Sequence, residues 1–454
     1  MARRTFALLA LPLALAFGQT PTHAVAAADS SPTLNKLRKE VASGKPGALQ
    51  DFWISITKTG TPLVEAIPEQ RYFSLVTFLG RGDEDTRNVV IFDGVAGFDA
   101  KDQMLHMAGT DVWFKTYRVR NDARFAYSLS RNDSLQSVND IKDEKQMEKR
   151  LAMLQPDPMN HLRCPATFGA HDAQYSYVEL ADAQPLIWES PVAGVPRGRV
   201  EETSIRSALL KTDKRIWVYT PAGFARAGKP YSLLVLFDGD RNVLWIPKVL
   251  DLLIAQRKIP AMVAVMTDES LPRVRGSELM CNPQFTNYLA RELVPWSRDR
   301  YNTTMQPERV AVAGSSLGGL ASVFAGLRHP DVFGNVISLS GSFWWKPQGG
   351  AGGERLTKQV EASPKLPVRF YLEVGLMEDD RMQIEPNHRM RDTLASKGYA
   401  LRYSEYNGGH SFLNWSQGVA DGLQYLFKDT GPRKPGDSLT QRSDSNLVLA
   451  HWTR

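Results

Sequence analysis

The stretch RVAVAGSSLGG, residues 309–319, decides the fold of this chain. Its first five residues are apolar or β-branched apart from Arg309, a composition that is typical of a buried strand. Behind the glycines, residues 320–327 carry apolar side chains at helical spacing, which predicts a helix. A strand, a tight glycine turn and a helix are the context in which the pattern G-x-S-x-G forms a nucleophile elbow. The stretch therefore predicts that Ser316 is a nucleophile, held exposed at the end of a strand.

Backbone amides beside this serine are predicted to stabilise an oxyanion. The N–H of Leu317 begins the predicted helix, where developing negative charge is favoured. In folds with this elbow the second donor comes from the loop after the third strand. Here Gly239 and Asp240 occupy that loop, although an Asp-Gly pair is also common in ordinary turns.

A serine nucleophile needs a base, and the base needs a carboxylate that fixes its tautomer. His410 is the predicted base because Gly408 and Gly409 free the backbone to present it beyond a strand. The acid is expected between the two along the chain. Glu378 is the first choice there, with Asp379 and Asp380 left as alternatives in the same loop.

Aromatic residues near the same edge are candidates for substrate binding. Trp344 and Trp345 leave the strand after the elbow helix, Trp245 follows the oxyanion loop, and Arg275 lies in a basic segment. Tryptophan faces are suited to stacking aromatic rings. Core packing remains the alternative for each tryptophan, and a surface charge the alternative for Arg275.

The organisation of the chain follows from two patterns. Short β-branched and aromatic runs between residues 51 and 135, separated by turns, predict a small all-β sandwich. From residue 190 strands alternate with helices, which predicts an α/β fold with a mostly parallel sheet. The expected strands are Arg215–Tyr219, Ser232–Phe237, Ala261–Met266, Arg309–Ala313, Val336–Leu339, Val368–Val374 and Leu401–Tyr406. The predicted divisions are a signal peptide (1–26), a linker or weak helix (27–50), a sandwich domain with its connector (51–190), an α/β-hydrolase domain (191–428) and a polar tail (429–454).

The first residues predict export. Arg3 and Arg4 precede an apolar stretch from Phe6 to Phe17 and a small-residue cleavage site near Ala26. This is the layout of a secretory signal peptide, and it predicts a periplasmic protein. The paired arginines leave open whether the general secretory or the twin-arginine route is used.

Composition excludes several classes of function. The 454 residues are 43% hydrophobic and 23% charged, as in soluble globular proteins, and the formal charge of +6 includes no basic block that would indicate nucleic-acid binding. No ligand spacing for a metal and no cofactor motif is seen. Cys164 and Cys281 could form one disulfide or remain separate thiols, and the oligomeric state is left open.

Together these residues resemble the enterochelin (enterobactin) esterase family. The similarity runs through Leu234–Gly239, Arg275 with the stretch ELMCN at 278–282, the Ser316 elbow, Ser338–Trp345 and the Gly-Gly-His at 408–410. The stretches AGTDVW at 108–113 and DPMN at 157–160 resemble the N-terminal domain of the family. Ser411 and Leu317 depart from the family, which often has aspartate and phenylalanine there.

The resemblance implies an enzyme that hydrolyses lactone esters of catecholate siderophores, with iron carried by the substrate. It also implies that Ser316, His410 and Glu378 are the catalytic residues, and that Arg275 and the tryptophans hold anionic catechol groups. Two alternatives stay open. One is a feruloyl-type or general acyl esterase whose sandwich binds carbohydrate, and the other is a siderophore-binding protein without catalysis.

Overall fold

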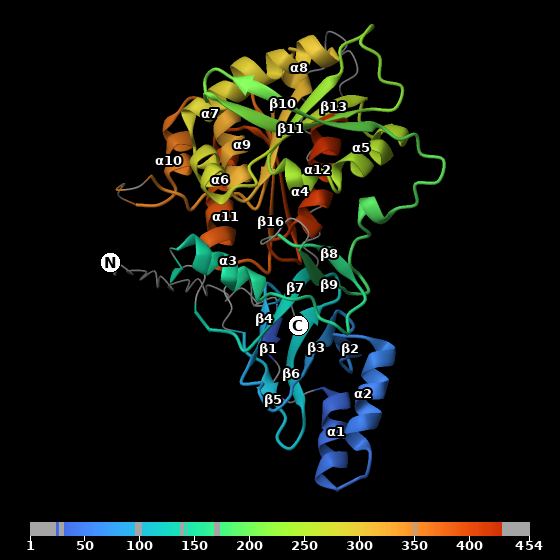
Figure 1. Cartoon of the computed structure of the whole chain (residues 1–454). Helices are drawn as coiled ribbons and strands as arrows, with labels where there is room; N and C mark the ends of the chain where they lie inside the picture. Colours follow the sequence, from blue (N-terminus) through green and yellow to red (C-terminus); the bar gives the residue numbers. More distant parts are fainter. Residues whose placement is uncertain are drawn as a thin grey trace, which may run out of the picture.

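The computed structural model describes residues 24–26, 31–95, 102–136, 140–141, 143–167, 173–347, 349 and 352–428. The predicted tail and all but Ala24–Ala26 of the predicted signal peptide lie outside these residues. Figure 1 shows two stacked parts, an N-terminal all-β part and a larger part built on a mixed sheet. The predicted fold class, an α/β-hydrolase domain preceded by a β sandwich, is confirmed.

The N-terminal part contains two antiparallel sheets. Their facing sides bury Phe78 and Tyr117 from one sheet and Phe125 and Tyr127 from the other. The first sheet holds β1 (Ala24–Ala26), β2 (Leu63–Ala66), β3 (Phe73–Arg81), β5 (Leu105–His106) and β6 (Val112–Arg120). The second holds β4 (Val89–Phe92), β7 (Arg124–Arg131), β8 (Arg163–Pro165) and β9 (Gln174–Glu179). Two helical segments belong to the same stretch of chain: α3 (Glu144–Ala152) lies between β7 and β8, and the 3₁₀ turn η2 (Ile187–Glu189) follows β9.

A helical hairpin stands where the sequence predicts part of a linker. It consists of α1 (Pro32–Ala42) and α2 (Ala48–Thr59), at the far end of the N-terminal part in Figure 1. The side chain of Ser31 caps α1, and Leu34 and Leu37 are buried against the first sheet. Of the two expectations for this segment, linker or weak helix, the structure has the helix, because the apolar stripe of this polar segment has a sheet to pack against.

The larger part is organised by an eight-stranded sheet with the order β10-β11-β13-β12-β14-β15-β16-β17. The strands from β13 to β17 in this order run parallel, and only β10 and β11 are antiparallel to their neighbours. All seven predicted strands are present. The strands are β10 (Arg199–Ser207), β11 (Thr212–Thr220), β12 (Ser232–Leu236), β13 (Met262–Thr267), β14 (Val310–Ser315), β15 (Asn335–Leu339), β16 (Arg369–Gly375) and β17 (Ala400–Tyr406).

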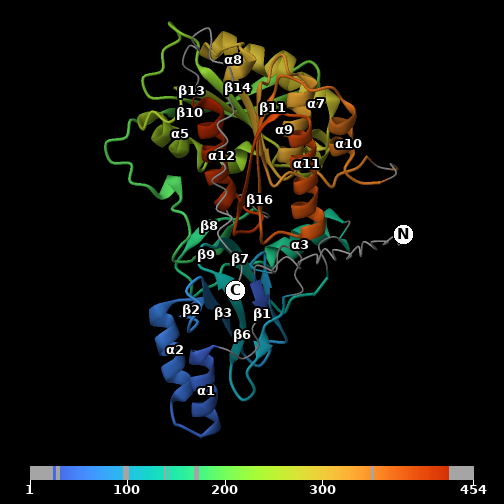
Figure 2. The ribbon, with the colours of Figure 1, turned by 180° about the vertical axis from the view of Figure 1, so that it is seen from behind.

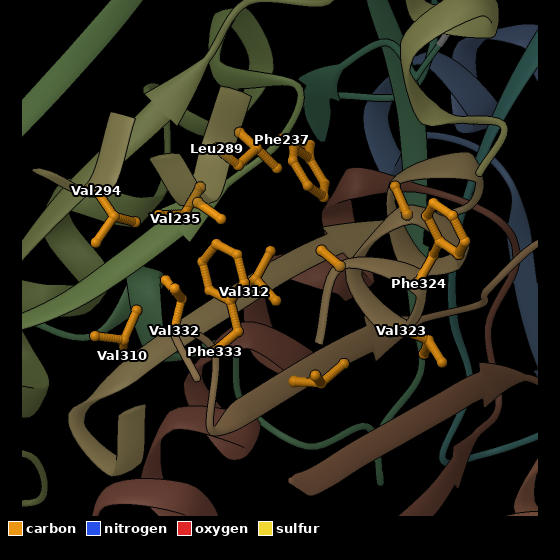
Figure 3. Close-up of a cluster of buried hydrophobic side chains, with 14 of the residues drawn as sticks. Val235, Phe237, Leu289, Val294, Val310, Val312, Val323, Phe324, Val332 and Phe333 are labelled. Atoms are coloured by element: carbon orange, nitrogen blue, oxygen red, sulfur yellow. The ribbon is translucent and has the colours of Figure 1, made fainter. Parts of the chain in front are cut away.

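Helices cover both faces of this sheet, as Figures 1 and 2 show from opposite sides. Alternate residues of a strand point to opposite faces, so Val310 and Val312 pack on one helix layer and Ala311 and Ala313 on the other. Figure 3 shows Val312 among valine and phenylalanine side chains of the first layer. That layer contains α7 (Pro283–Tyr288), the π turn η3 (Leu289–Leu293), α8 (Val294–Tyr301), α9 (Leu317–Arg328), α10 (Arg355–Ala362) and α11 (Glu385–Ser396). The second contains α5 (Ile246–Ala255) and α12 (Phe412–Phe427). The remaining short segments are α4 (Gly239–Asn242), α6 (Pro272–Leu279), η4 (Pro307–Arg309) and η5 (Asp380–Ile384).

No helix among the described residues is long and apolar enough to span a bilayer. In the same residues, no cluster of three histidine, cysteine, aspartate or glutamate side chains could hold a metal ion. The two cysteines are separate thiols, Cys164 buried in the N-terminal part and Cys281 in the turn between α6 and α7. Burial raises the pKa of the Cys281 thiol to about 12 and that of Cys164 further, so both behave as apolar side chains.

Candidate active site

Ser316 occupies the sharp turn between β14 and α9. Its backbone has φ 58° and ψ −120°, a conformation that non-glycine residues rarely adopt. At Gly314 a Cβ would lie 2.7 Å from the carbonyl oxygen of Gly318, so only glycine lets strand and helix approach this closely. The predicted elbow is therefore present. It leaves the Ser316 side chain half-buried at the carboxyl end of the strand.

Two loops bring amides toward this turn. Leu317 is the first residue of α9, and the first amides of a helix have no acceptor within the helix. Gly239 and Asp240 begin α4 directly behind β12, which is the neighbour of β14 in the sheet. Both predicted donor segments thus lie at the carboxyl edge of adjacent strands.

His410 is paired with Glu378. The Nδ1 atom of His410 lies 2.5 Å from Glu378 Oε2, and the carboxylate side chain is only 1% exposed. The other oxygen, Oε1, accepts hydrogen bonds from the Ser340 hydroxyl at 2.5 Å and from the Gly375 amide at 3.0 Å. With Nδ1–H donated to the carboxylate, the lone pair of the imidazole is on Nε2.

The structure distinguishes among the three carboxylates that the sequence left as candidates for the acid. Asp379 and Asp380 are exposed, and the Asp379 side chain caps η5 by accepting from the Met382 amide at 2.7 Å. Only Glu378 turns inward, because its Oε1 accepts from the amide of Gly375 three residues earlier. Among the three, Glu378 is the one that reaches the imidazole.

Residues that the sequence analysis did not assign connect the two halves of the site. The loop after β15 contributes Ser342, whose Oγ lies 3.4 Å from Ser316 Oγ, and Ser340, which contacts Glu378. The indole of Trp415 packs edge-on against the His410 ring with 4.6 Å between centroids. Its Nε1–H donates to Ser340 Oγ at 3.1 Å. One loop therefore touches both the nucleophile and the acid. The available signal was its position at the carboxyl end of the strand between them.

Arg275 is engaged by the protein itself. Its Nε and Nη2 atoms lie 2.7 and 2.9 Å from the two carboxylate oxygens of Asp238, the residue before the oxyanion loop. Nη2 also lies 3.5 Å from the carbonyl oxygen of Ser315, which precedes the nucleophile. The guanidinium thus joins the oxyanion loop to the elbow, a contact that its prediction as a substrate-binding residue did not anticipate.

Beneath this pair lies a buried carboxyl. Glu269 follows β13, and its Oε2 accepts the Asp238 amide at 2.8 Å. Burial, and then the charge of Asp238, raise the pKa of Glu269 to about 8. The side chain therefore carries a proton at neutral pH and holds Asp238 in its left-handed backbone conformation without adding a charge.

The three predicted tryptophans differ in position. Trp344 and Trp345 are partly exposed behind the Ser342 loop, and Trp345 also packs against the hydrophobic core of the larger part. Trp245 is 6% exposed and packs edge-on against Trp188 at 4.5 Å, in an apolar cluster shared with the N-terminal part. Its position is that of a packing residue between the two parts rather than of an open stacking face.

Comparison with known proteins agrees with the fold. Residues 75–188 match the family model of the enterochelin esterase N-terminal domain, and residues 207–426 match that of putative esterases. An iron(III) enterobactin esterase of Escherichia coli is 31% identical in a match 342 residues long, which covers 72% of this chain and 83% of that protein. A solved enterobactin esterase of Shigella flexneri is 26% identical with a TM-score of 0.66, covering 84% of this chain and 98% of that one.

A ferric enterobactin esterase of Salmonella typhimurium is 25% identical with a TM-score of 0.68, covering 83% of this chain and 98% of that one. These likenesses extend through both parts of the molecule. The chain therefore belongs to the enterobactin esterase family and is a carboxylic ester hydrolase with an α/β-hydrolase catalytic domain.

Proposed function

We propose that this chain is a serine esterase that hydrolyses the lactone esters of catecholate siderophores of the enterobactin type. The observation that carries the proposal is the Glu378–His410 pair, which lies at the same sheet edge as the strained Ser316 elbow. The relatives supply the substrate class, since one was solved in the presence of enterobactin and another is an iron(III) salmochelin esterase.

The proposed reaction begins with attack of Ser316 Oγ on a lactone carbonyl carbon, while His410 Nε2 takes the hydroxyl proton. The amides of Leu317 and of Gly239 or Asp240 stabilise the oxyanion. The intermediate collapses as His410 returns the proton to the departing serine oxygen of the lactone, leaving an acyl-enzyme. A water molecule then loses a proton to His410 and attacks the acyl carbon, and the proton passes to Ser316 as the carboxylic acid leaves.

Glu378 stabilises the imidazolium that forms in both halves of this cycle. Trp344 and Trp345 offer faces to catechol rings. Iron enters and leaves as part of the substrate. Opening the trilactone would weaken its hold on iron and so favour release of the metal.

Product analysis by mass spectrometry tests the proposal. Incubation with apo- and ferric enterobactin should give linear species, each heavier by one water per ester cleaved, and then smaller acylserine units. Feruloyl sugars serve as the competing substrate. Faster turnover of feruloyl sugars than of either trilactone would favour the acyl esterase alternative. The absence of covalent labelling of Ser316 by a fluorophosphonate would favour a binding protein without catalysis.

Export to the periplasm is part of the same proposal, supported by the arginines, apolar stretch and small residues before Ala26. N-terminal sequencing of the protein from a periplasmic fraction should find a chain that begins near residue 27. Replacing both Arg3 and Arg4 with lysine distinguishes the routes, because a block of export would indicate the twin-arginine pathway. An uncleaved chain recovered only from the cytoplasm would contradict the proposal.

A further inference from the structure

The loop that carries His410 rests on the N-terminal part of the molecule. The amide of Arg124, the first residue of β7, donates to the carbonyl oxygen of Asn407 at 2.9 Å. In return the Asn407 Nδ2 donates to Asp122 Oδ1 at 2.7 Å. Figures 1 and 2 both show β7 beneath the end of the catalytic sheet. Two hydrogen bonds therefore cross between the domains three residues before the imidazole.

A third contact continues through α12. Asn414 lies in the first turn of that helix and is 7% exposed. Its Nδ2 lies 3.3 Å from two carbonyl oxygens, that of Arg124 in the N-terminal part and that of Gly409 in the histidine loop. One amide group thus ties the residue next to His410 to the start of β7.

The approach is close enough to require glycine. A Cβ on Gly408 would lie 2.5 Å from the carbonyl oxygen of Arg124. The Gly408 carbonyl in turn accepts the Met377 amide at 3.0 Å, so the histidine loop and the acid loop are bonded to each other. Met377, adjacent to Glu378, is 5% exposed and is buried in the core of the sandwich with Phe125 and Tyr127. The N-terminal part therefore touches the loops of both the base and the acid.

A buried carboxyl faces the same loop. Asp93 follows β4 and is 2% exposed, and a Cβ on Gly409 would lie 3.8 Å from its Oδ1. Burial, and then the charge of Glu378, raise the pKa of Asp93 well above its usual value. Asp93 thus lies under the histidine loop, where burial and the nearby charge of Glu378 both disfavour its ionised form.

We propose that the N-terminal sandwich is a positioning element of the active site, acting through Asp122, Arg124 and Asn414 on the loop that presents His410. The proposal rests on the assignment of His410 as the base. It gives the sandwich a function in catalysis beyond stability, because a misplacement of 1 Å in a catalytic group can cost about 10²-fold in rate. The substrate does not enter the argument, so the proposal holds for any ester that the site cleaves.

The chain offers a matched test on one helix. Asn414→Ala removes the contact to the histidine loop, whereas Gln417→Ala removes another hydrogen bond between the same two parts, from the Ile187 amide at 2.9 Å. We expect Asn414→Ala to lower kcat by about tenfold, which is less than the loss of about 10²-fold that a misplacement of 1 Å can cause. KM should stay unchanged. Gln417→Ala should leave kcat unchanged while both variants lose thermal stability.

A second pair separates geometry from charge. Asp122→Ala removes the acceptor for Asn407, whereas Asp122→Asn keeps an acceptor oxygen but abolishes the ion pair with Arg120 at 2.7 Å. Asp122→Ala should lose kcat as Asn414→Ala does, and Asp122→Asn should restore it. The rate of labelling of Ser316 by a tagged alkyl fluorophosphonate, which needs the base but no siderophore, should follow kcat in every variant.

Normal kcat and labelling rates in both Asn414→Ala and Asp122→Ala, measured on folded protein, would overturn the inference. An equal loss in Gln417→Ala would also overturn it, because the effect would then come from interdomain packing in general. His410→Ala separates this failure from that of the proposed function. If His410→Ala turns over normally, the assignment of the base is wrong. If it is inactive while the positioning variants are normal, only the positioning proposal fails.

Discussion

The two sides of the active site are supported by different parts of the molecule. The nucleophile side, with Ser316 and the oxyanion loop, is held within the catalytic domain by the Asp238–Arg275 pair. The base side, with His410 and Glu378, contacts the N-terminal sandwich through a hydrogen bond of Asn407 and the packing of Met377. The first support is charged and local, and the second is mostly neutral and crosses between domains. Changes on the first side should therefore act on the oxyanion, and changes on the second should act on proton transfer.

The largest effect is expected at the nucleophile. Ser316→Ala removes the attacking oxygen and should lower kcat by about 10⁶-fold, as in other serine triads, with the fold retained. Steady-state kinetics and circular dichroism would measure both. Ser342→Ala is the matched control, since that hydroxyl lies only 3.4 Å away but has no assigned part in attack. If Ser316→Ala retained turnover in a preparation free of wild-type enzyme, Ser316 would not be the nucleophile, and neither side of the site could be assigned its role.

The next effect tests the base side. Glu378→Gln keeps the size of the side chain but cannot stabilise the imidazolium, so kcat should fall by about 10⁴-fold. Asp380→Asn, two residues away and exposed, should leave kcat unchanged. Enzyme assays on the two variants under one set of conditions decide between the carboxylates. A larger loss in Asp380→Asn than in Glu378→Gln would show that the wrong carboxylate has been placed beside His410.

The nucleophile side is tested at Arg275. Arg275→Lys cannot reproduce the two-pronged contact with Asp238, so the oxyanion loop should loosen. We expect kcat to fall by roughly 10- to 100-fold, less than the cost of losing an oxyanion donor, with KM unchanged. Arg389→Lys, which alters an exposed pair with Glu354, is the control. A rise in KM for catecholate substrates at constant kcat would instead make Arg275 a substrate-binding residue.

Local patterns predicted one side of the site better than the other. Ser316 and Leu317 could be placed because strand, turn and helix are all encoded within nineteen consecutive residues, 309–327. His410 and Glu378 could be named from chain order, but the choice of Glu378 over Asp379 depends on a turn at Gly375 that no composition reveals. The partners of Arg275 were missed for the same reason, since its carboxylate lies 37 residues earlier in the chain.

The fold was likewise predicted well where the signal is local and less well where it depends on contacts between distant segments. The five central strands, β12 to β16, were predicted because burial on both faces gives them continuous apolar runs. β10 was missed because this edge strand exposes Arg199, Glu201 and Glu202 and reads as a polar segment. Trp245 was read as a binding residue because its burial depends on Trp188, which belongs to a separate region of the sequence. Contacts between distant segments decide these cases.

The smallest effect concerns the buried carboxyl under the oxyanion loop. Because the pKa of Glu269 is about 8 in the folded protein and 4.5 without burial, the folded state holds its proton more tightly. Its contribution to stability is complete below pH 4.5 and is lost as the pH rises through 8.

Glu269→Gln keeps an oxygen for the Asp238 amide but does not titrate. Urea unfolding of wild type and variant between pH 4.5 and 9 should therefore show the wild type losing stability relative to Glu269→Gln, by on the order of a few kcal/mol across this range. Glu361→Gln, at an exposed position, should show no such divergence. Parallel pH profiles for the wild type and Glu269→Gln would mean that Glu269 is ionised in the folded protein. The nucleophile side would then be supported by charged side chains only, those of Glu269, Asp238 and Arg275.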